Sequence, residues 1–238
     1  MSKTITKHIP NTITCCNLFS GCVATCMAFS GEPGKALLFI ILGAVFDFFD
    51  GMTARLLHVS SPIGKELDSL ADDVTFGVAP ATMVYSLLYT LSYPAWLESM
   101  RGVLPYVAFV MAAFAALRLA KFNLDERQTT SFIGLPTPAN ALFWGSLIVG
   151  AGTRLQQASW SWAVVLVLIA LSCWIMVSEV PMFALKFKQW GWRGNEVKYI
   201  FILSCIPLLL FLGVSGLAAI IAWYVILSII TTKKNITN

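Results

Sequence analysis

Long apolar segments follow one another along the whole chain, separated by short polar stretches. A membrane-spanning helix needs about 20 predominantly apolar residues, and the chain offers about eight segments near that length. We place helices at 12–30, 35–57, 67–92, 102–121, 137–153, 158–180, 197–213 and 215–232. The pattern predicts an all-α polytopic membrane protein with about eight transmembrane helices. Since no long polar block divides it, we expect a single membrane-embedded domain over residues 1–238.

Basic residues predict the orientation of these helices. With eight spans, both termini lie on the same side of the membrane. If that side is the cytoplasm, thirteen of the sixteen lysines and arginines lie on inner segments, and Lys35, Arg101 and Arg154 lie on outer ones. This distribution agrees with the positive-inside rule, so we expect both termini to be cytoplasmic.

Composition supports the membrane interpretation and narrows the partners. The chain is 58% hydrophobic and 12% charged, whereas soluble domains are about 25% charged. The net charge of +4 fits attraction to anionic lipid headgroups. The sequence has no run of basic residues interleaved with aromatic residues that could stack on bases, so we expect no nucleic-acid partner. The six cysteines form no Cys-x-x-Cys pair, and we interpret them as packing residues.

Four aspartates interrupt the second and third apolar segments. Asp47 and Asp50 are three residues apart and Asp68 and Asp72 are four apart, so each pair lies on one face of its helix. An aspartate at the bilayer centre costs about 3 kcal/mol on insertion scales, so these side chains must face a wet, protein-lined cavity. The short connection makes the two helices antiparallel neighbours. We therefore expect the four carboxylates to converge.

Converging carboxylates repel one another, and divalent cations relieve that repulsion. Oxygen ligands without cysteine or histidine favour magnesium or manganese, and two such ions suit phosphoryl-type transfer. The small residues Gly51 and Ala54 would let a bulky ligand approach the helix, and Arg55 is a natural phosphate partner. Spacing alone leaves a second interpretation open, in which the acids form a cation or proton pathway in a transporter.

The acidic segment also matches a known signature, D-x2-D-G-x2-A-R-x8-G-x3-D-x3-D, at every fixed position. In this respect the chain resembles the CDP-alcohol phosphotransferase family. Residues 9–14, 66–81, 116–123 and 132–138 are similar to its phosphatidylserine synthase branch, with the departure that Lys121 stands where arginine is expected. The resemblance covers the first 140 or so residues. The fixed positions are Asp47, Asp50, Gly51, Ala54, Arg55, Gly64, Asp68 and Asp72.

The resemblance implies roles for particular residues. Two divalent cations, Mg2+ or Mn2+, would be bound by the four aspartates, and Asp72 would also be the general base. The catalytic domain would be the whole chain, 1–238, with its core signature at 47–72. Residues expected to contact the CDP part of the lipid are Asn11, Thr14, Gly51, Ala54, Arg55 and Ser61.

The implied reaction transfers the phosphatidyl group of CDP-diacylglycerol to L-serine, giving phosphatidylserine and CMP. Arg118 and Asn123 are candidates for contacts with serine or phosphate, with Lys65 and Glu66 on the same side. Arg118 and Lys121 could instead be ordinary inner-surface anchors. The family further implies a homodimer in the lipid bilayer, with a cytoplasmic active site, and a small synthase of this type suggests a bacterial inner membrane. Two alternatives remain: the same chemistry with glycerol 3-phosphate, inositol phosphate or a choline-like alcohol, and a cation- or proton-coupled transporter.

Overall fold

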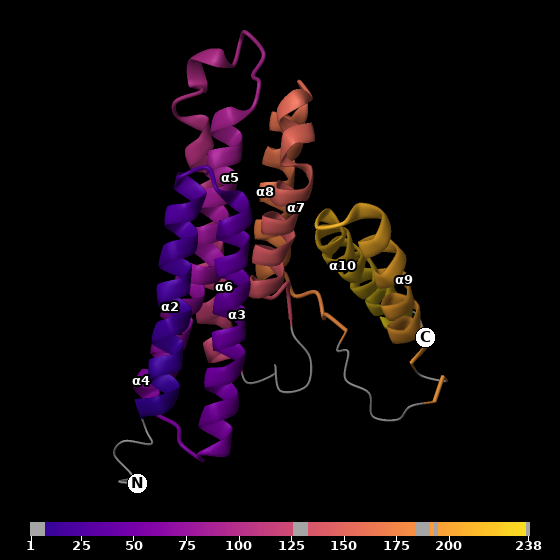
Figure 1. Ribbon diagram of the computed structural model, residues 1–238. Helices are drawn as coiled ribbons and strands as arrows, with labels where there is room; N and C mark the ends of the chain where they lie inside the picture. The colour runs from indigo at the N-terminus through magenta and orange to yellow at the C-terminus, as the bar shows by residue number, and fades with distance from the viewer. Residues whose placement is uncertain (1–7, 126–132, 184–190, 193–194, 237–238) are drawn as a thin grey trace.

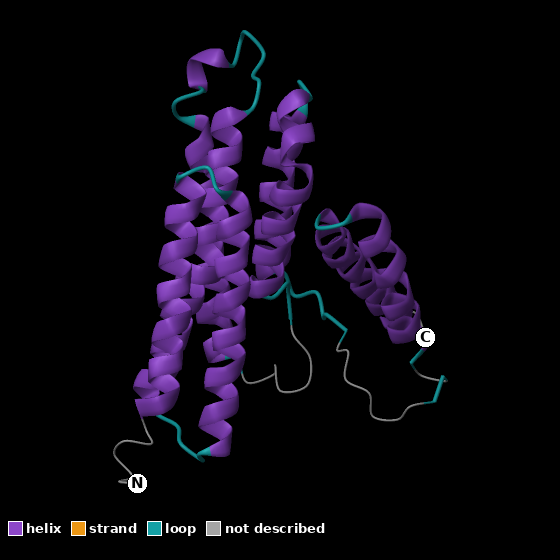
Figure 2. Cartoon of the chain, in the orientation of Figure 1, coloured by secondary structure: helices purple, strands orange, loops and turns teal. Residues whose placement is uncertain are grey.

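The computed structural model describes residues 8–125, 133–183, 191–192 and 195–236. Within them every regular element is a helix, apart from one isolated antiparallel bridge between Ile133 and Pro181 (Figures 1 and 2). The all-α prediction is therefore confirmed. The elements are α2 (His8–Phe29), α3 (Pro33–Leu56), α4 (Pro62–Asp72), η1 (Asp73–Val78), α5 (Ala79–Thr90), η2 (Glu98–Met100), η3 (Leu104–Phe109), α6 (Val110–Leu124), α7 (Thr137–Gln157), α8 (Ser161–Val177), α9 (Glu196–Leu212) and α10 (Ser215–Ile236).

Each predicted apolar segment is helical. The third comprises α4, η1 and α5 and the fourth comprises η3 and α6, while the others differ from single helices mainly at their ends. The third segment, expected from residue 67, begins at Pro62, because the Ser61 hydroxyl caps the helix by accepting the Gly64 backbone N–H at 3.0 Å. Proline at the first helical position fits this start. The fifth segment, expected to be short, extends to Gln157 as α7.

Within the described residues, three helices are long and apolar enough to cross a membrane by length and composition: His8–Phe29, Pro33–Leu56 and Leu104–Leu124. Ser161–Val177 and Ser215–Thr231 are shorter apolar helices. Large apolar side chains also lie on the outside of the molecule, among them Phe48, Leu210 and Phe211. Such exposed apolar faces suit helices that are surrounded by lipid.

The helices that carry the acidic residues form one bundle. Helix α2 packs along α3 and also contacts α4, η1 and α5, and Figure 1 shows α2, α3, α5 and α6 side by side. Helix α7 packs against α3 and α5, and α10 joins the α9–α10 hairpin to α7 (Figure 1). Asp47 and Asp50 lie towards the C-terminal end of α3, and Asp68 and Asp72 lie on α4, which packs against α2.

A π-helical segment, η1, directly follows Asp72 and joins α4 to α5. Its Thr75 is fully buried and donates from Oγ1 to the carbonyl oxygen of Asn17 on α2 at 3.0 Å. Gly43 of α3 permits this close packing, because a Cβ there would lie 2.5 Å from Thr75 Cγ2. The π-helix thus ties α4 and α5 to α2 and α3 next to the acidic residues, a place where π-segments often occur.

Candidate active site

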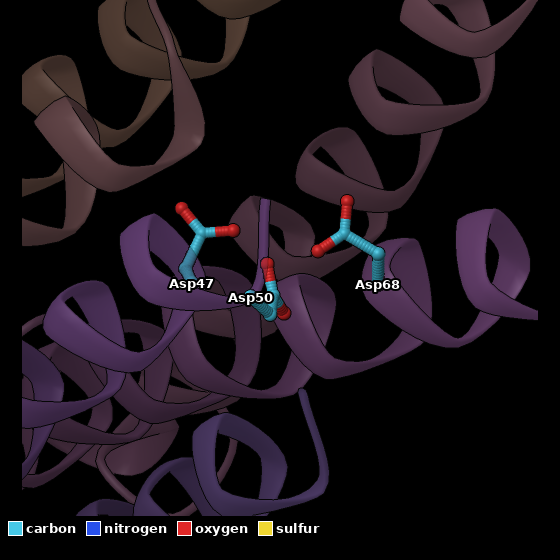
Figure 3. Close-up of side chains that lie close together, drawn as sticks. All are labelled: Asp47, Asp50 and Asp68. Carbon is cyan, nitrogen blue, oxygen red and sulfur yellow. The ribbon is translucent and has the colours of Figure 1, made fainter. Parts of the chain in front are cut away.

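Three aspartates from two helices form a cluster. Asp47 and Asp50 project from α3 and Asp68 projects from α4 (Figure 3), and one carboxylate oxygen from each lies within 4.8 Å of the other two. Asp50 is buried, and the other two are half-buried. The spacing-based prediction that these helices bring their acids together is thus met for three of the four residues.

Asp72 lies one turn beyond Asp68 and is not a member of this group of three. Its charge still interacts with those of Asp47, Asp68 and Asp50. The fully buried Asn17 of α2 donates from Nδ2 to Asp72 Oδ1 at 3.0 Å. Asp72 therefore occupies a separate position beside the cluster, oriented by a neighbouring helix.

Thr14 supports the cluster from the same helix as Asn17. Its buried hydroxyl donates to Asp50 Oδ2 at 2.6 Å, although the sequence suggested a contact with the CDP part of a lipid. Sequence reasoning missed the partners of Thr14 and Asn17. Their polar character within an apolar segment and their three-residue spacing on one helix face were the available signal.

The cluster has the features of a divalent-cation site. Its three carboxylates repel one another at this separation, and Asp68 Oδ1 is buried without a hydrogen-bond partner in the described part of the chain. A buried carboxylate oxygen without a partner is costly. A cation with a preference for oxygen ligands resolves both costs, so the residues present fit magnesium or manganese.

A cavity of about 280 Å³ opens beside Asp50 and Asp68. Five of the six residues expected to contact the CDP part of a lipid line it, whereas Arg55 is exposed and donates from Nε to the Gly51 carbonyl at 3.0 Å. Gly51 leaves open space, since the nearest atom to a Cβ there is a guanidinium nitrogen of Arg55 at 4.0 Å. The lining residues are Pro10, Asn11, Thr14, Asp50, Gly51, Ala54, Val59, Ser60, Ser61, Gly64, Lys65 and Asp68.

The candidates for acceptor contacts separate into two groups. Lys65 Nζ donates to the carbonyl oxygen of Asn123 at 2.9 Å, and Asn123 Nδ2 donates to Ser69 Oγ at 2.7 Å. These bonds connect α4 to the end of α6. Glu66 is exposed, and Arg118 is buried in the wall of a second cavity.

A helical protein with exposed apolar faces and a carboxylate cluster belongs to the class of membrane-embedded proteins with a candidate metal site. Comparison makes the class specific: the model of the CDP-alcohol phosphatidyltransferase family matches residues 7–174, and the chain belongs to this family. It is an integral membrane protein, and the family's divalent-metal chemistry agrees with the acidic cluster.

Several similar proteins carry the name CDP-diacylglycerol–serine O-phosphatidyltransferase. The protein of that name from Bacillus subtilis (strain 168) is 42% identical over 133 residues, which cover 56% of this chain and 70% of the relative. Its namesake from Mycobacterium leprae (strain TN) is 31% identical over 184 residues, 73% of this chain and 57% of the relative. The protein of that name from Saccharomyces cerevisiae (strain ATCC 204508 / S288c) is 38% identical over 147 residues, which cover 55% of this chain and 50% of the relative. The chain thus spans about half the length of the mycobacterial and yeast relatives.

Proposed function

We propose that this chain transfers the phosphatidyl group of CDP-diacylglycerol to L-serine, releasing CMP and forming phosphatidylserine. The observation that carries the proposal is the convergence of Asp47, Asp50 and Asp68 at the edge of a cavity. Support for serine as the acceptor comes from the names of the similar proteins in bacteria and yeast.

Asp72 is proposed as the general base. Because Asn17 donates to Oδ1, the other carboxylate oxygen of Asp72 is left to accept the proton of the serine hydroxyl. The serine oxygen then forms a bond to the lipid-side phosphorus, and the bond from that phosphorus to the CMP oxygen breaks. The proton remains on Asp72 and the electron pair leaves with CMP. Orientation of the two reactants supplies a large part of such an acceleration.

The donor lipid is proposed to bind at the 280 Å³ cavity, with its diphosphate near Asp50 and Asp68 and its acyl chains left in the bilayer. Asn11, Thr14, Gly51, Ala54 and Ser61 would contact the CDP part there, with Arg55 at the exposed end. Asp47, Asp50, Asp68 and Asp72 would hold two divalent cations, Mg2+ or Mn2+, and these would neutralise charge on the diphosphate oxygens.

The assembly and location are proposed as well. We expect a homodimer in a bacterial inner membrane, with both termini and the active site on the cytoplasmic side. The distribution of basic residues along the sequence supports this orientation.

The test is CMP release by detergent-purified protein supplied with CDP-diacylglycerol, Mg2+ or Mn2+, and one alcohol at a time. We expect release with L-serine, and a loss of at least about 100-fold in Asp72→Asn, because that change removes the proton acceptor. The matched control is Asp73→Asn, since the Asp73 carboxylate lies beside Gly77 and outside the cluster. Release with glycerol 3-phosphate or inositol phosphate instead would replace the acceptor. No release with any alcohol would favour the transporter.

A further inference from the structure

A second cavity, of about 340 Å³, lies between the inner end of α6 and the end of α8. It shares no lining residue with the cavity beside Asp50 and Asp68, and its volume is within the range of small-molecule sites. The residues that line it are Arg118, Lys121, Phe122, Leu124, Asp125, Ile133, Met176, Val177, Ser178 and Glu179.

Arg118 is the unusual member of this lining. Its side chain is 6% exposed, and Nε is buried without a hydrogen-bond partner among the residues the structure describes. The guanidinium carbon lies over the Phe122 ring at 5.3 Å from its centre, a contact far weaker than an ion pair. A buried guanidinium group whose Nε–H makes no hydrogen bond is expensive, so this arrangement is suited to an anionic ligand that accepts from it.

Arg118 also interacts electrostatically with one of the proposed reacting groups. Asp72, the proposed base, is the acidic residue whose charge acts on Arg118. The first cavity, in contrast, borders Asp50 and Asp68. The first cavity therefore borders the cluster directly, whereas the second is linked to Asp72 through Arg118 in its wall.

The charges along the second cavity favour a zwitterion. Among the lining residues that the structure describes, the cationic Arg118 and Lys121 are matched in number by the acidic Asp125 and Glu179. A carboxylate and an ammonium group on one small molecule match this balance. A phosphate monoester brings about two negative charges and no positive one, so it would meet the acidic residues unfavourably.

One wall of this cavity is fixed by backbone contacts. Gly134 has φ +72°, which favours glycine, and its N–H donates to the Val180 carbonyl at 2.9 Å. A Cβ at this position would lie 2.5 Å from the Met176 carbonyl oxygen. Residues 133–135 are therefore held against the end of α8, which fixes the position of Ile133 in the cavity lining.

From this geometry we infer that the second cavity is the acceptor site, and that Arg118 binds the carboxylate of the amino-acid acceptor. The inference rests on the proposed function and adds the group that recognises serine. Arg118 would hold the carboxylate through paired N–H donors while the serine hydroxyl points to Asp72.

The test compares L-serine with L-serinamide, which lacks the anionic carboxylate, as acceptors in the CMP-release assay. In the unchanged protein we expect kcat/KM to be about 100-fold higher for L-serine, as charge-assisted hydrogen bonds imply. In Arg118→Gln this preference should fall to a few-fold, with KM for CDP-diacylglycerol unchanged. Arg118→Lys should recover part of it, because charge is kept but the paired donors are lost. Arg154→Gln, at the exposed outer end of α7, is the matched control.

An unaltered serine preference in Arg118→Gln, or a raised KM for CDP-diacylglycerol alone, would overturn the inference. If Arg118→Gln does not fold, the comparison of L-serine with L-serinamide in the unchanged protein still tests the inference. Equal kcat/KM for the two acceptors would contradict a cationic site that binds the carboxylate. Failure of the proposed function looks different, because the unchanged protein would then release no CMP with L-serine.

Discussion

At the scale of single residues, two hydrogen bonds from α2 hold two of the four aspartates. Thr14 donates to Asp50 at 2.6 Å and Asn17 donates to Asp72 at 3.0 Å. Hydrogen bonds to ionised carboxylates are stronger than neutral ones, and both donors are buried. They fix which carboxylate oxygens remain available for a cation, or for the proton of an acceptor.

Replacing the Thr14 hydroxyl should therefore weaken metal binding. In Thr14→Val we expect the Mn2+ concentration for half-maximal activity to rise about 10- to 100-fold, the usual effect of removing a residue that orients a metal ligand. Thr14→Ser keeps the hydroxyl and is the control. Calorimetric Mn2+ binding should shift in parallel, and an unchanged affinity in Thr14→Val would show that this hydrogen bond does not orient a ligand.

The sequence predicts which aspartates form the cluster but not the side chains that orient them, and the reason is physical. Asp47, Asp50 and Asp68 follow from helical spacing and the cost of burying acids in lipid. The contact between Asn17 and Asp72 does not, because it depends on how α2 and α4 are shifted along each other. Spacing within one helix contains no information on that shift. The predicted convergence is met for Asp47, Asp50 and Asp68. Asp72 lies beside them, with its charge interacting with all three and its Oδ1 bound by Asn17.

At the scale of elements, the position of Asp72 depends on packing among α2, α3 and η1. Thr75 bonds to the Asn17 backbone, while a Cβ on Gly43 would lie 2.9 Å from Asn17 Oδ1. The same contact region thus sets both the helix spacing and the orientation of Asn17. The apolar pattern predicts that a helix spans this region, but it does not show the π-segment, because that segment depends on contacts from other helices.

Gly43→Ala should therefore cost stability and activity together. We expect a destabilisation of about 1–3 kcal/mol, typical of overpacking, and reduced CMP release because Asn17 is displaced from Asp72. Gly34→Ala in the same helix is the matched control, since no atom lies within 4 Å of its Cβ position. The measurement is thermal unfolding in detergent alongside the release assay.

Adding Thr75→Ser to Gly43→Ala removes the methyl group that the new Cβ would meet at 2.5 Å. The double variant should regain part of the lost stability, and no recovery would show that the close contact is not the cause.

At the scale of the whole molecule, the cationic residues near the candidate site lie at one end of the bundle. Arg55, Lys65 and Arg118 are at this end, and Lys65 joins α4 to α6. At the other end, Arg101 pairs with Glu98 and donates to the Leu91 carbonyl at 3.1 Å. The Arg101 guanidinium lowers the pKa of the exposed Glu98 carboxyl.

Several basic residues that the sequence analysis places on the inner side lie outside the described residues. They are Lys3, Lys7, Arg127, Lys186, Lys188 and Arg193.

This asymmetry predicts the orientation of the protein in its membrane. The end with the acidic cluster should face the cytoplasm, because most basic residues lie on the segments predicted to be inner and the proposed acceptor, serine, would arrive from that side. Cysteines introduced in place of Ser99, in η2, and Ser60, between α3 and α4, would report the two ends, since both side chains are exposed. A membrane-impermeant thiol reagent added to intact cells should label Ser99→Cys and not Ser60→Cys, which should react only after the membrane is opened. The unchanged protein gives the background from its own cysteines.

The reverse labelling would place the site outside and contradict a cytoplasmic supply of serine. Labelling of both positions in intact cells would mean that the two loops do not lie on opposite sides of the membrane.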